Sequence, residues 1–411
     1  MEIVQFRHAP FPTQKAVLNN GLTIITAETN SPIACVGIGI LAGGFHGDVA
    51  GTAHFLEHII CDGPSRSGMH PRLRPFYRTG INTNAETSGR GTYYWAAGYA
   101  HQAGALIKAL AEICFQPEFH HQIEEERKII LEEIAQRENP DESWKMQTLY
   151  PDAPWVHRTP LGTETSVRGI QPSDLEDFFR THYVAARTAV IATGGIHSDE
   201  IVQIVEQCLG SLKSGTPTER FASIAPTIAR AAHISAHNPP GILLYTPRQY
   251  PIPLLEDIQL DLALRTIGDS QFGELHQRLR YRTPLVYSAK IIAHEGWAPR
   301  FEIGTFCDPS KFDQVEHEIV DMFNNPATAI SEEIVACQRA HLEKYFLVRG
   351  QDPSPSRWEK ILRDRWMDND WEDEDVLAIV RTIRLEDLAE VSMRHFANRP
   401  FGRLDLTRPV E

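Results

Sequence analysis

Hydrophobic positions along the first half of the chain predict alternating strands and helices. Residues 21–28, 34–41 and 187–196 are short apolar runs rich in β-branched side chains, which is the pattern of strands. Longer stretches with apolar residues three and four positions apart predict amphipathic helices. These helices are expected at residues 51–60, 101–115, 122–137 and 198–212, and a further helix opens at residue 173.

The same order of elements recurs in the second half, after a segment at residues 213–232 whose Pro, Gly and Ser content is typical of a linker. Strands are expected at 241–246, 286–293 and 300–306, and helices at 254–267, 274–280, 311–324, 331–347, 356–365 and 385–397. The recurrence indicates an internal duplication. We therefore predict an N-terminal lobe at 1–212 and a C-terminal lobe at 233–411, joined by that linker.

Composition narrows the class of protein. The chain has 411 residues, of which 42% are hydrophobic and 23% are charged, as in soluble globular proteins. No apolar run reaches the length of a membrane span, and the N-terminus lacks the basic and apolar pattern of a secretory signal. The net charge of −14 argues against a nucleic-acid partner. Six scattered cysteines are expected to be reduced core residues of a cytoplasmic protein.

The strongest candidate chemistry lies in the predicted helix at residues 51–60, which carries His54, Glu57 and His58. Residues three and four apart share a helix face, so the two imidazoles and the carboxylate should point the same way. Two imidazoles in that arrangement suit zinc, and a carboxylate between them suits a general base acting on water. The alternative is a pair of solvated or core histidines on an ordinary amphipathic helix. Zinc would also need a third protein ligand from elsewhere in the chain.

The predicted helix at residues 122–137 carries further acidic side chains. Glu126 and Glu133 are two turns apart on one face, and Ile130 lies between them. A glutamate near a buried seam is unfavourable unless it is paired or binds a metal ion. A solvated acidic face is the better explanation for the other glutamates of this helix, which are Glu124, Glu125 and Glu132.

The inverted His-x-x-Glu-His order, followed by a helix with two glutamates seven residues apart, resembles the inverzincin metallopeptidases. This family includes the pitrilysin, insulin-degrading and mitochondrial-processing-peptidase types. The resemblance implies an α+β fold with two homologous lobes, each a mostly antiparallel β-sheet packed with α-helices. It also implies that His54, His58 and Glu133 bind zinc, that Glu57 activates water, and that Glu126 supports the site without binding the metal. The second lobe has no such motif, so one zinc ion per chain is expected.

Two further segments extend the resemblance to substrate binding. The region from residue 82 to 97 predicts a strand pair, and the family's Asn-Ala-x-Thr segment matches Asn84, Ala85 and Thr87. The free edge of such a strand can take up an extended peptide, although an ordinary edge hairpin gives the same pattern. Arg280 and Tyr287 match an arginine and a tyrosine of the family's catalytic chains. In that role they would hold the substrate and steady an oxyanion, and otherwise they are a surface arginine and a strand-end tyrosine.

These assignments leave three hypotheses. The first is an active zinc endopeptidase that cleaves extended or unfolded peptides inside a chamber between lobes, for which we expect a homodimer. The second is a non-catalytic structural subunit of the same fold. The third is a heterodimer with a related chain that supplies the arginine and the tyrosine. The complete set of His54, Glu57, His58, Glu126 and Glu133 favours the first hypothesis.

Overall fold

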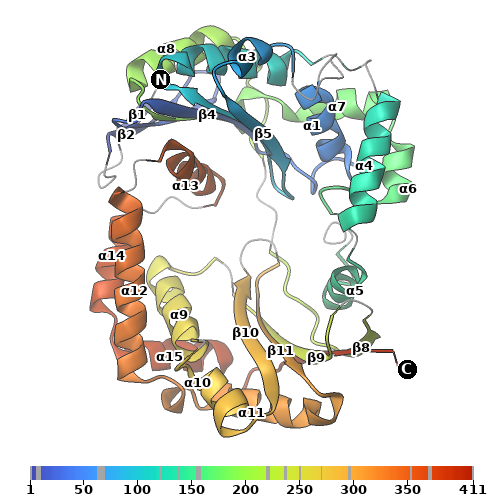
Figure 1. Cartoon of the computed structure of the whole chain (residues 1–411), viewed down its shortest axis with the longest axis vertical. Helices are drawn as coiled ribbons and strands as arrows, with labels where there is room; N and C mark the ends of the chain where they lie inside the picture. The colour runs from blue at the N-terminus through green and yellow to red at the C-terminus, as the bar shows by residue number, and fades with distance from the viewer. Residues whose placement is uncertain are drawn as a thin grey trace. The chain divides into compact units, whose positions relative to one another are not determined.

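The computed structural model describes residues 2–5, 11–62, 70–117, 119, 123–137, 139–153, 159–218, 223–235, 238–249, 251–269, 271–294, 298–351, 354–368 and 373–409. They form two compact units, shown in Figure 1, and each unit is built from three stretches of the chain. The first unit comprises Met1–Glu138, Arg158–Arg220 and Gly350–Glu372, and the second comprises Asn139–His157, Phe221–Arg349 and Asp373–Glu411.

These units correct the predicted continuous lobes at 1–212 and 233–411. Helix α5 (Pro140–Leu149) lies within the first predicted lobe but belongs to the second unit, and α13 (Pro355–Asp368) shows the opposite exchange. A hydrophobic pattern shows which face of a helix is buried, but not which sheet covers that face. The predicted linker at 213–232 does contain one boundary between the units, although its last residues form strand β8 (Arg230–Ile234).

The first unit contains a seven-stranded sheet, whose strands in sheet order are β1 (Glu2–Gln5), β2 (Thr13–Val17), β3 (Thr23–Glu28), β7 (Thr188–Gly194), β4 (Ile33–Ile40), β6 (Thr92–Tyr99) and β5 (Asn82–Thr87). All neighbouring strands are antiparallel except β3 and β7, which are parallel. Strands β4 and β7 are buried almost throughout, which agrees with their nearly continuous apolar sequences.

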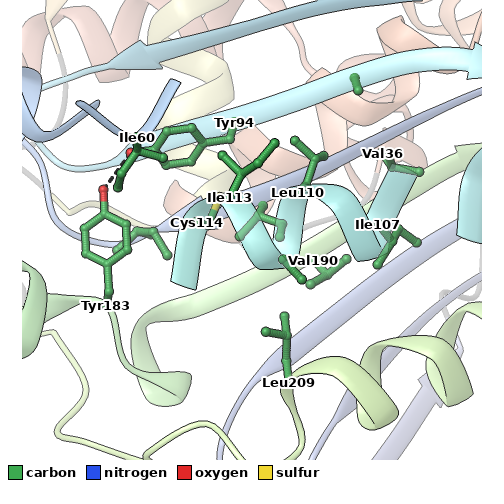
Figure 2. Close-up of a cluster of buried hydrophobic side chains, with 14 of the residues drawn as sticks. Val36, Ile60, Tyr94, Ile107, Leu110, Ile113, Cys114, Tyr183, Val190 and Leu209 are labelled. Carbon is green, nitrogen blue, oxygen red and sulfur yellow. Dashed lines mark hydrogen bonds between the residues drawn. The ribbon is translucent and has the colours of Figure 1, made fainter. Parts of the chain in front are cut away.

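Helices cover both faces of this sheet. Helices α3 (Ala103–Phe115) and α8 (Ser198–Leu209) pack on one face, and α13 packs on the other (Figure 1). Figure 2 shows part of the core under α3, with Val36 of β4, Leu110 of α3 and Val190 of β7. In the same core the hydroxyl groups of Tyr94 and Tyr183 are 2.7 Å apart, so two buried polar groups satisfy each other. The other α-helices described in this unit are α1 (Thr52–Asp62), α2 (Arg74–Tyr77), α4 (Ile123–Arg137), α6 (Glu164–Gly169) and α7 (Pro172–His182).

The second unit contains a five-stranded sheet, whose strands in sheet order are β10 (Val286–His294), β11 (Arg300–Cys307), β9 (Gly241–Pro247), β12 (Gly402–Thr407) and β8. Only β8 and β12 are parallel. Its helices are α5, α9 (Leu254–Ile267), α10 (Glu274–His276), α11 (Phe312–Asn324), α12 (Glu332–Gln351), α14 (Asp373–Thr382) and α15 (Leu385–Phe396). Among the described residues of the whole chain, no helix combines the length and the apolar character that crossing a membrane requires.

The two sheets repeat one design. Strands β3, β7, β4, β6 and β5 of the first sheet correspond in order and direction to β8, β12, β9, β11 and β10 of the second, including the single parallel pair. The helices also recur in sequence order, because α4 precedes α5 as α12 precedes α13. Each half of the sequence therefore contributes one helix to the unit built mainly from the other half. The predicted α+β fold with two homologous, mostly antiparallel lobes is confirmed.

The six cysteines are all free thiols. Cys35, Cys114 and Cys307 are buried, as the sequence analysis predicts for core residues. Cys337 is exposed, because it lies on the solvent side of α12, and the prediction is wrong for this residue.

Candidate metal centre

Helix α1 begins where two glycines bring separate backbone segments together. Gly51, directly before the helix, has φ of 90°, and Gly162 has φ of 79°, a region that side chains other than hydrogen rarely adopt. A Cβ atom on Gly51 would lie 2.8 Å from the carbonyl oxygen of Leu161, and one on Gly162 would lie 2.8 Å from that of Ala50. This close approach fixes the position from which α1 starts.

The helix presents the three predicted side chains on one side. His54 and His58 lie one turn apart, and their ring centroids are 4.7 Å apart. Glu57 lies between them, and only 8% of its surface is exposed. Phe55, on another side of the helix, is fully buried in the core and holds that orientation.

Helix α4 brings both predicted glutamates to these histidines. An oxygen of Glu133 lies 3.6 Å from Nε2 of His54 and 3.6 Å from Nε2 of His58. Glu126 is buried, and its carboxylate lies 3.1 Å from Nδ1 of His58. The other oxygen of Glu133 pairs with Arg137 at 3.0 Å, one turn further along α4. Glu133 thus turns one oxygen to the histidines and the other to a cation.

Two imidazole nitrogens and one carboxylate oxygen therefore converge on one point. The ligand atoms of His54, His58 and Glu133 all lie within 4.8 Å of one another. In the part of the chain that the structure describes, this is the one group of histidine, cysteine and acidic side chains that could hold a metal ion. The hydrogen bond from Nδ1 of His58 to Glu126 leaves Nε2 of that ring free to bind metal, which is the usual arrangement behind a ligand histidine.

Burial and neighbouring charges shift the pKa values of His54 and His58 in opposite directions. Burial, with the neighbouring charges of His58 and Arg137, lowers the pKa of His54 to about 3. Burial also acts to lower the pKa of His58, but the hydrogen bond to Glu126 and the nearby carboxylates outweigh it, so that this pKa is raised. A bound cation would compete with the proton on His58, because a ligand imidazole must be neutral.

Glu57 has the environment of a general base. Burial raises its pKa, and the hydroxyl group of Thr87 opposes that shift by donating a hydrogen bond of 2.7 Å to Oε2. A carboxylate whose pKa is raised towards neutrality is better matched to taking and returning a proton at physiological pH. The sequence analysis assigned Thr87 to substrate binding, and the structure adds this contact with the candidate base.

The structure also shows a residue that the sequence analysis missed. Arg127 of α4 is buried and donates hydrogen bonds to the backbone carbonyls of Val167 and, at 2.9 Å, Ile170. Its guanidinium carbon lies 5.2 Å from the ring centroid of Phe55 on α1. Arg127 therefore links α4, which carries the two glutamates, to α1. The sequence around Arg127 does not predict these hydrogen bonds, because the carbonyl partners lie about forty residues further along the chain.

Strand β5 borders the centre and forms the end of its sheet. It pairs with β6 and is the last strand in the described sheet order, so its outer edge is unpaired there. Asn84 and Ala85 of this strand help to line a pocket of about 220 Å³ that also reaches Glu57 and His58. The rest of this pocket is lined by Leu73, by Tyr94 of β6 and by Leu110 and Ile113 of α3, together with His70, Thr83 and Cys61.

Arg280 and Tyr287 belong to the second unit, whereas the histidines and glutamates belong to the first. Arg280 lies in a π-helical turn at Gln277–Arg282, and its guanidinium carbon is 5.6 Å from the ring centroid of Tyr287. Tyr287 is 78% exposed and lies between Val286 and Ser288, where the pairing of β10 with β11 shifts register. Both irregularities are common at functional sites because they redirect side chains.

Two protein-family models match this chain. Residues 23–161 match the family model described as insulinase (peptidase family M16), and residues 169–342 match the one described as peptidase M16 inactive domain. A probable mitochondrial-processing peptidase subunit beta of Arabidopsis thaliana is 32% identical over 213 residues, which are 50% of this chain and 40% of that relative. The mitochondrial-processing peptidase subunit beta of Lentinula edodes is 30% identical over 210 residues, 49% of this chain and 45% of the relative. The chain thus spans less than half the length of these relatives.

Solved structures share the fold along nearly the whole chain. A protease from Helicobacter pylori superposes with a TM-score of 0.80 and 17% identity, covering 97% of this chain and 100% of its own. A peptidase M16 inactive domain from Pseudomonas fluorescens gives 0.81 and 16%, covering 97% and 98%. With two adjoining family models on its sequence and this fold throughout, the chain belongs to the M16, or insulinase, family of peptidases.

Proposed function

We propose that the protein is a zinc-dependent endopeptidase that hydrolyses extended or unfolded peptides. The convergence of His54, His58 and Glu133, with the buried carboxylate of Glu57 beside them, carries this proposal. Three protein ligands leave a fourth position open, which is the pattern of catalytic rather than structural zinc sites. We infer one zinc ion per chain.

The chemistry divides between the metal and the chain. Zinc, when bound, supplies the Lewis acidity that activates a water molecule and polarises the scissile carbonyl group. Glu57 accepts the proton of the attacking water and passes it to the leaving amine nitrogen. Thr87 holds the carboxylate of Glu57 in place, and Glu126 holds the ring of His58, through the hydrogen bonds described above.

The substrate site follows from the strand beside the centre. An extended peptide can add to the outer edge of β5 through backbone hydrogen bonds, which tolerates many sequences. The pocket of about 220 Å³ beside Glu57 would take one apolar side chain of that peptide. Asn84, Ala85 and Thr87 are the binding residues on this strand. For Arg280 and Tyr287 we propose the roles of holding a substrate carbonyl or carboxylate and of steadying the oxyanion.

We further propose that the protein works as a homodimer that encloses its substrates in a chamber. Symmetric self-association is the commonest route to a closed assembly. The names of the curated relatives describe beta subunits, so a heterodimer with a related chain is the alternative. A cytoplasmic location is proposed because six free thiols suit a reducing compartment. Light scattering would separate monomer from dimer, and a sequence cleaved as a free peptide but spared inside a stable folded domain would support the chamber.

The competing proposal is a non-catalytic subunit of the same fold, because one matched model is described as an inactive domain. The test is to incubate the zinc-loaded protein with a mixed peptide library and to identify cleavage sites by mass spectrometry, before and after removal of the metal. Cleavage that disappears with the metal and returns with zinc supports the endopeptidase. Binding of zinc without any cleavage would favour the non-catalytic subunit.

A further inference from the structure

The second unit contains a cavity of about 510 Å³ between α5 and the face of its sheet. Trp144 of α5 lines one side, and the floor is formed by side chains of β9, β10, β11 and β12. Cavities of a few hundred cubic ångströms are large enough for a small molecule or for one or two residues of a peptide. Nothing in the proposed peptidase chemistry uses this cavity.

The internal duplication shows that the cavity is a departure from the repeated design. In the first unit the matching helix, α13, packs directly on its sheet, and Leu362 and Trp366 fill the space with Tyr93 of β6. That packing leaves no room, because a Cβ atom on Gly39 of β4 would lie 2.5 Å from the ring of Trp366. The same helix–sheet space is therefore a closed core in one unit.

In the second unit that space is open at its floor. Gly304 of β11 lies there, and a Cβ atom on it would meet only Leu243, at an ordinary contact distance of 3.7 Å. Ile292 and Phe306, which flank Gly304 on the floor, keep 37% and 39% of their surface exposed. Apolar side chains left exposed in a concave site are characteristic of ligand-binding surfaces.

Most charges around the cavity already have partners within the unit. Asp141 of α5 accepts hydrogen bonds from Ser235, at 2.5 Å, and Asn238. Glu142 pairs with Lys145 at 2.6 Å. The bonds of Asp141 hold α5 to the rest of the unit, whereas the Glu142–Lys145 pair lies within α5.

Two further charged residues line the cavity. Glu302 is buried and pairs with Arg300 at 2.5 Å and with His294 at 3.1 Å. Lys290 of β10 is exposed, and it is the one charged residue of the described cavity lining that pairs with no other side chain. A ligand would therefore meet an apolar floor and a single available ammonium group.

We propose that this cavity binds the apolar C-terminal residue of a peptide, with its terminal carboxylate on Lys290. The side chain would cover Ile292 and Phe306, while the ammonium group would form a charge-assisted hydrogen bond to the carboxylate. Lys290 and Ile292 lie on the end strand of the sheet, so the rest of the peptide can leave past the sheet edge. The supply of such peptides rests on the proposed function, since every cleavage leaves a new terminal carboxylate, but the binding does not.

The experiment measures binding of an N-acetylated tetrapeptide ending in Leu-Phe, offered as the free acid and as the C-terminal amide. Calorimetry is done on the full chain as purified and after treatment with EDTA, so that zinc cannot supply the carboxylate site. We expect the acid to bind about tenfold more tightly than the amide in both samples. Equal binding of acid and amide by the EDTA-treated chain would overturn the proposal, and so would binding of free aliphatic acids without binding of the peptide.

Matched variants locate the site. Lys290→Gln should bring the acid down to the affinity of the amide, whereas Lys108→Gln, at an exposed position in the first unit, should change neither affinity. Gly304→Leu should abolish binding of both peptides by filling the cavity, and Gly304→Ala, which has room for its methyl group, provides a milder step if the larger variant does not fold. Unchanged binding in a folded Gly304→Leu variant would overturn the proposal, and so would a preference for the acid that survives in Lys290→Gln. A chain that shows this pattern but cleaves no peptide would refute the proposed function alone.

Discussion

The hydrogen bond between Thr87 and Glu57 gives a sharp test of the assigned base. Thr87→Val keeps the shape of the side chain but removes the hydroxyl group that donates to Glu57 at 2.7 Å. Burial raises the pKa of Glu57, and this hydrogen bond lowers it. Removing the bond therefore raises that pKa further, and the carboxylate form that accepts the proton becomes scarcer at any pH on the acidic side of the rate profile.

The size of the expected loss of rate follows from the negative charge of Glu57, which accepts the hydrogen bond. A hydrogen bond to a charged group contributes about 1.5–3 kcal/mol, and about 1.4 kcal/mol corresponds to a factor of ten in an equilibrium. On the acidic limb, kcat/KM should thus fall roughly 10- to 100-fold in Thr87→Val. At higher pH, where Glu57 is ionised in both proteins, the two rates should converge.

The assay is the pH dependence of kcat/KM for one fluorogenic peptide, with zinc content measured in each sample. Thr83→Val is the matched control, because Thr83 lies on the same strand but donates its hydroxyl hydrogen to the carbonyl of Trp95 at 2.9 Å. The control should keep the wild-type pH profile even if its KM changes. A uniform loss of rate in Thr87→Val at every pH would refute the reasoning, because it would mean that Thr87 does not act through the ionisation of Glu57.

Three further predictions concern the candidate zinc ligands, the pair Arg280 and Tyr287, and the buried His182 of α7. His58→Ala and Glu133→Ala should lose zinc, whereas Glu126→Gln should weaken zinc binding by about 10- to 100-fold, as measured by metal analysis and competition with a chelator; full zinc affinity in Glu133→Ala would exclude it as a ligand. Arg280→Ala and Tyr287→Phe should keep zinc and lower kcat/KM, by about a hundredfold for Tyr287→Phe if Tyr287 donates to the oxyanion. Wild-type rates in both variants would mean that Arg280 and Tyr287 are ordinary surface residues. Burial and the charge of Arg187 lower the pKa of His182 from 6.5 to about 4, so the unfolded chain takes up this proton first and stability should fall as the pH drops from about 6.5 to 4. Urea unfolding should show that this loss of stability approaches about 3 kcal/mol. The loss should shrink in His182→Gln but not in the exposed control His197→Gln. An identical dependence of stability on pH in His182→Gln would contradict the assignment of the loss to His182.

The local part of the candidate site could be predicted because it depends on helix geometry alone. His54, Glu57 and His58 share a face at any place where residues 51–60 form a helix. The pairing of that helix with Glu126 and Glu133 is a tertiary contact, and it came from the family resemblance and not from spacing. The duplication was also visible, because the order of strands and helices is a property of the sequence.

The features that could not be predicted from the sequence depend on contacts between residues that are distant in the chain. The exchange of α5 and α13 between the units leaves no trace in their hydrophobic patterns. The contacts of Arg127 with backbone carbonyls and the space above Gly304 arise only when separate segments meet. The register shift at Tyr287 is likewise set by pairing with β11 and not by local propensity.

The central claim is that Glu57 acts as the general base for peptide hydrolysis beside a zinc ion held by His54, His58 and Glu133. The most direct measurement compares wild type and Glu57→Gln at equal zinc content, with cleavage of an unstructured peptide followed by mass spectrometry. Because the substitution leaves all three ligands in place, the variant should bind about one zinc ion and lose at least about a hundredfold in turnover. Cleavage by Glu57→Gln at a rate close to that of the wild type would contradict the account.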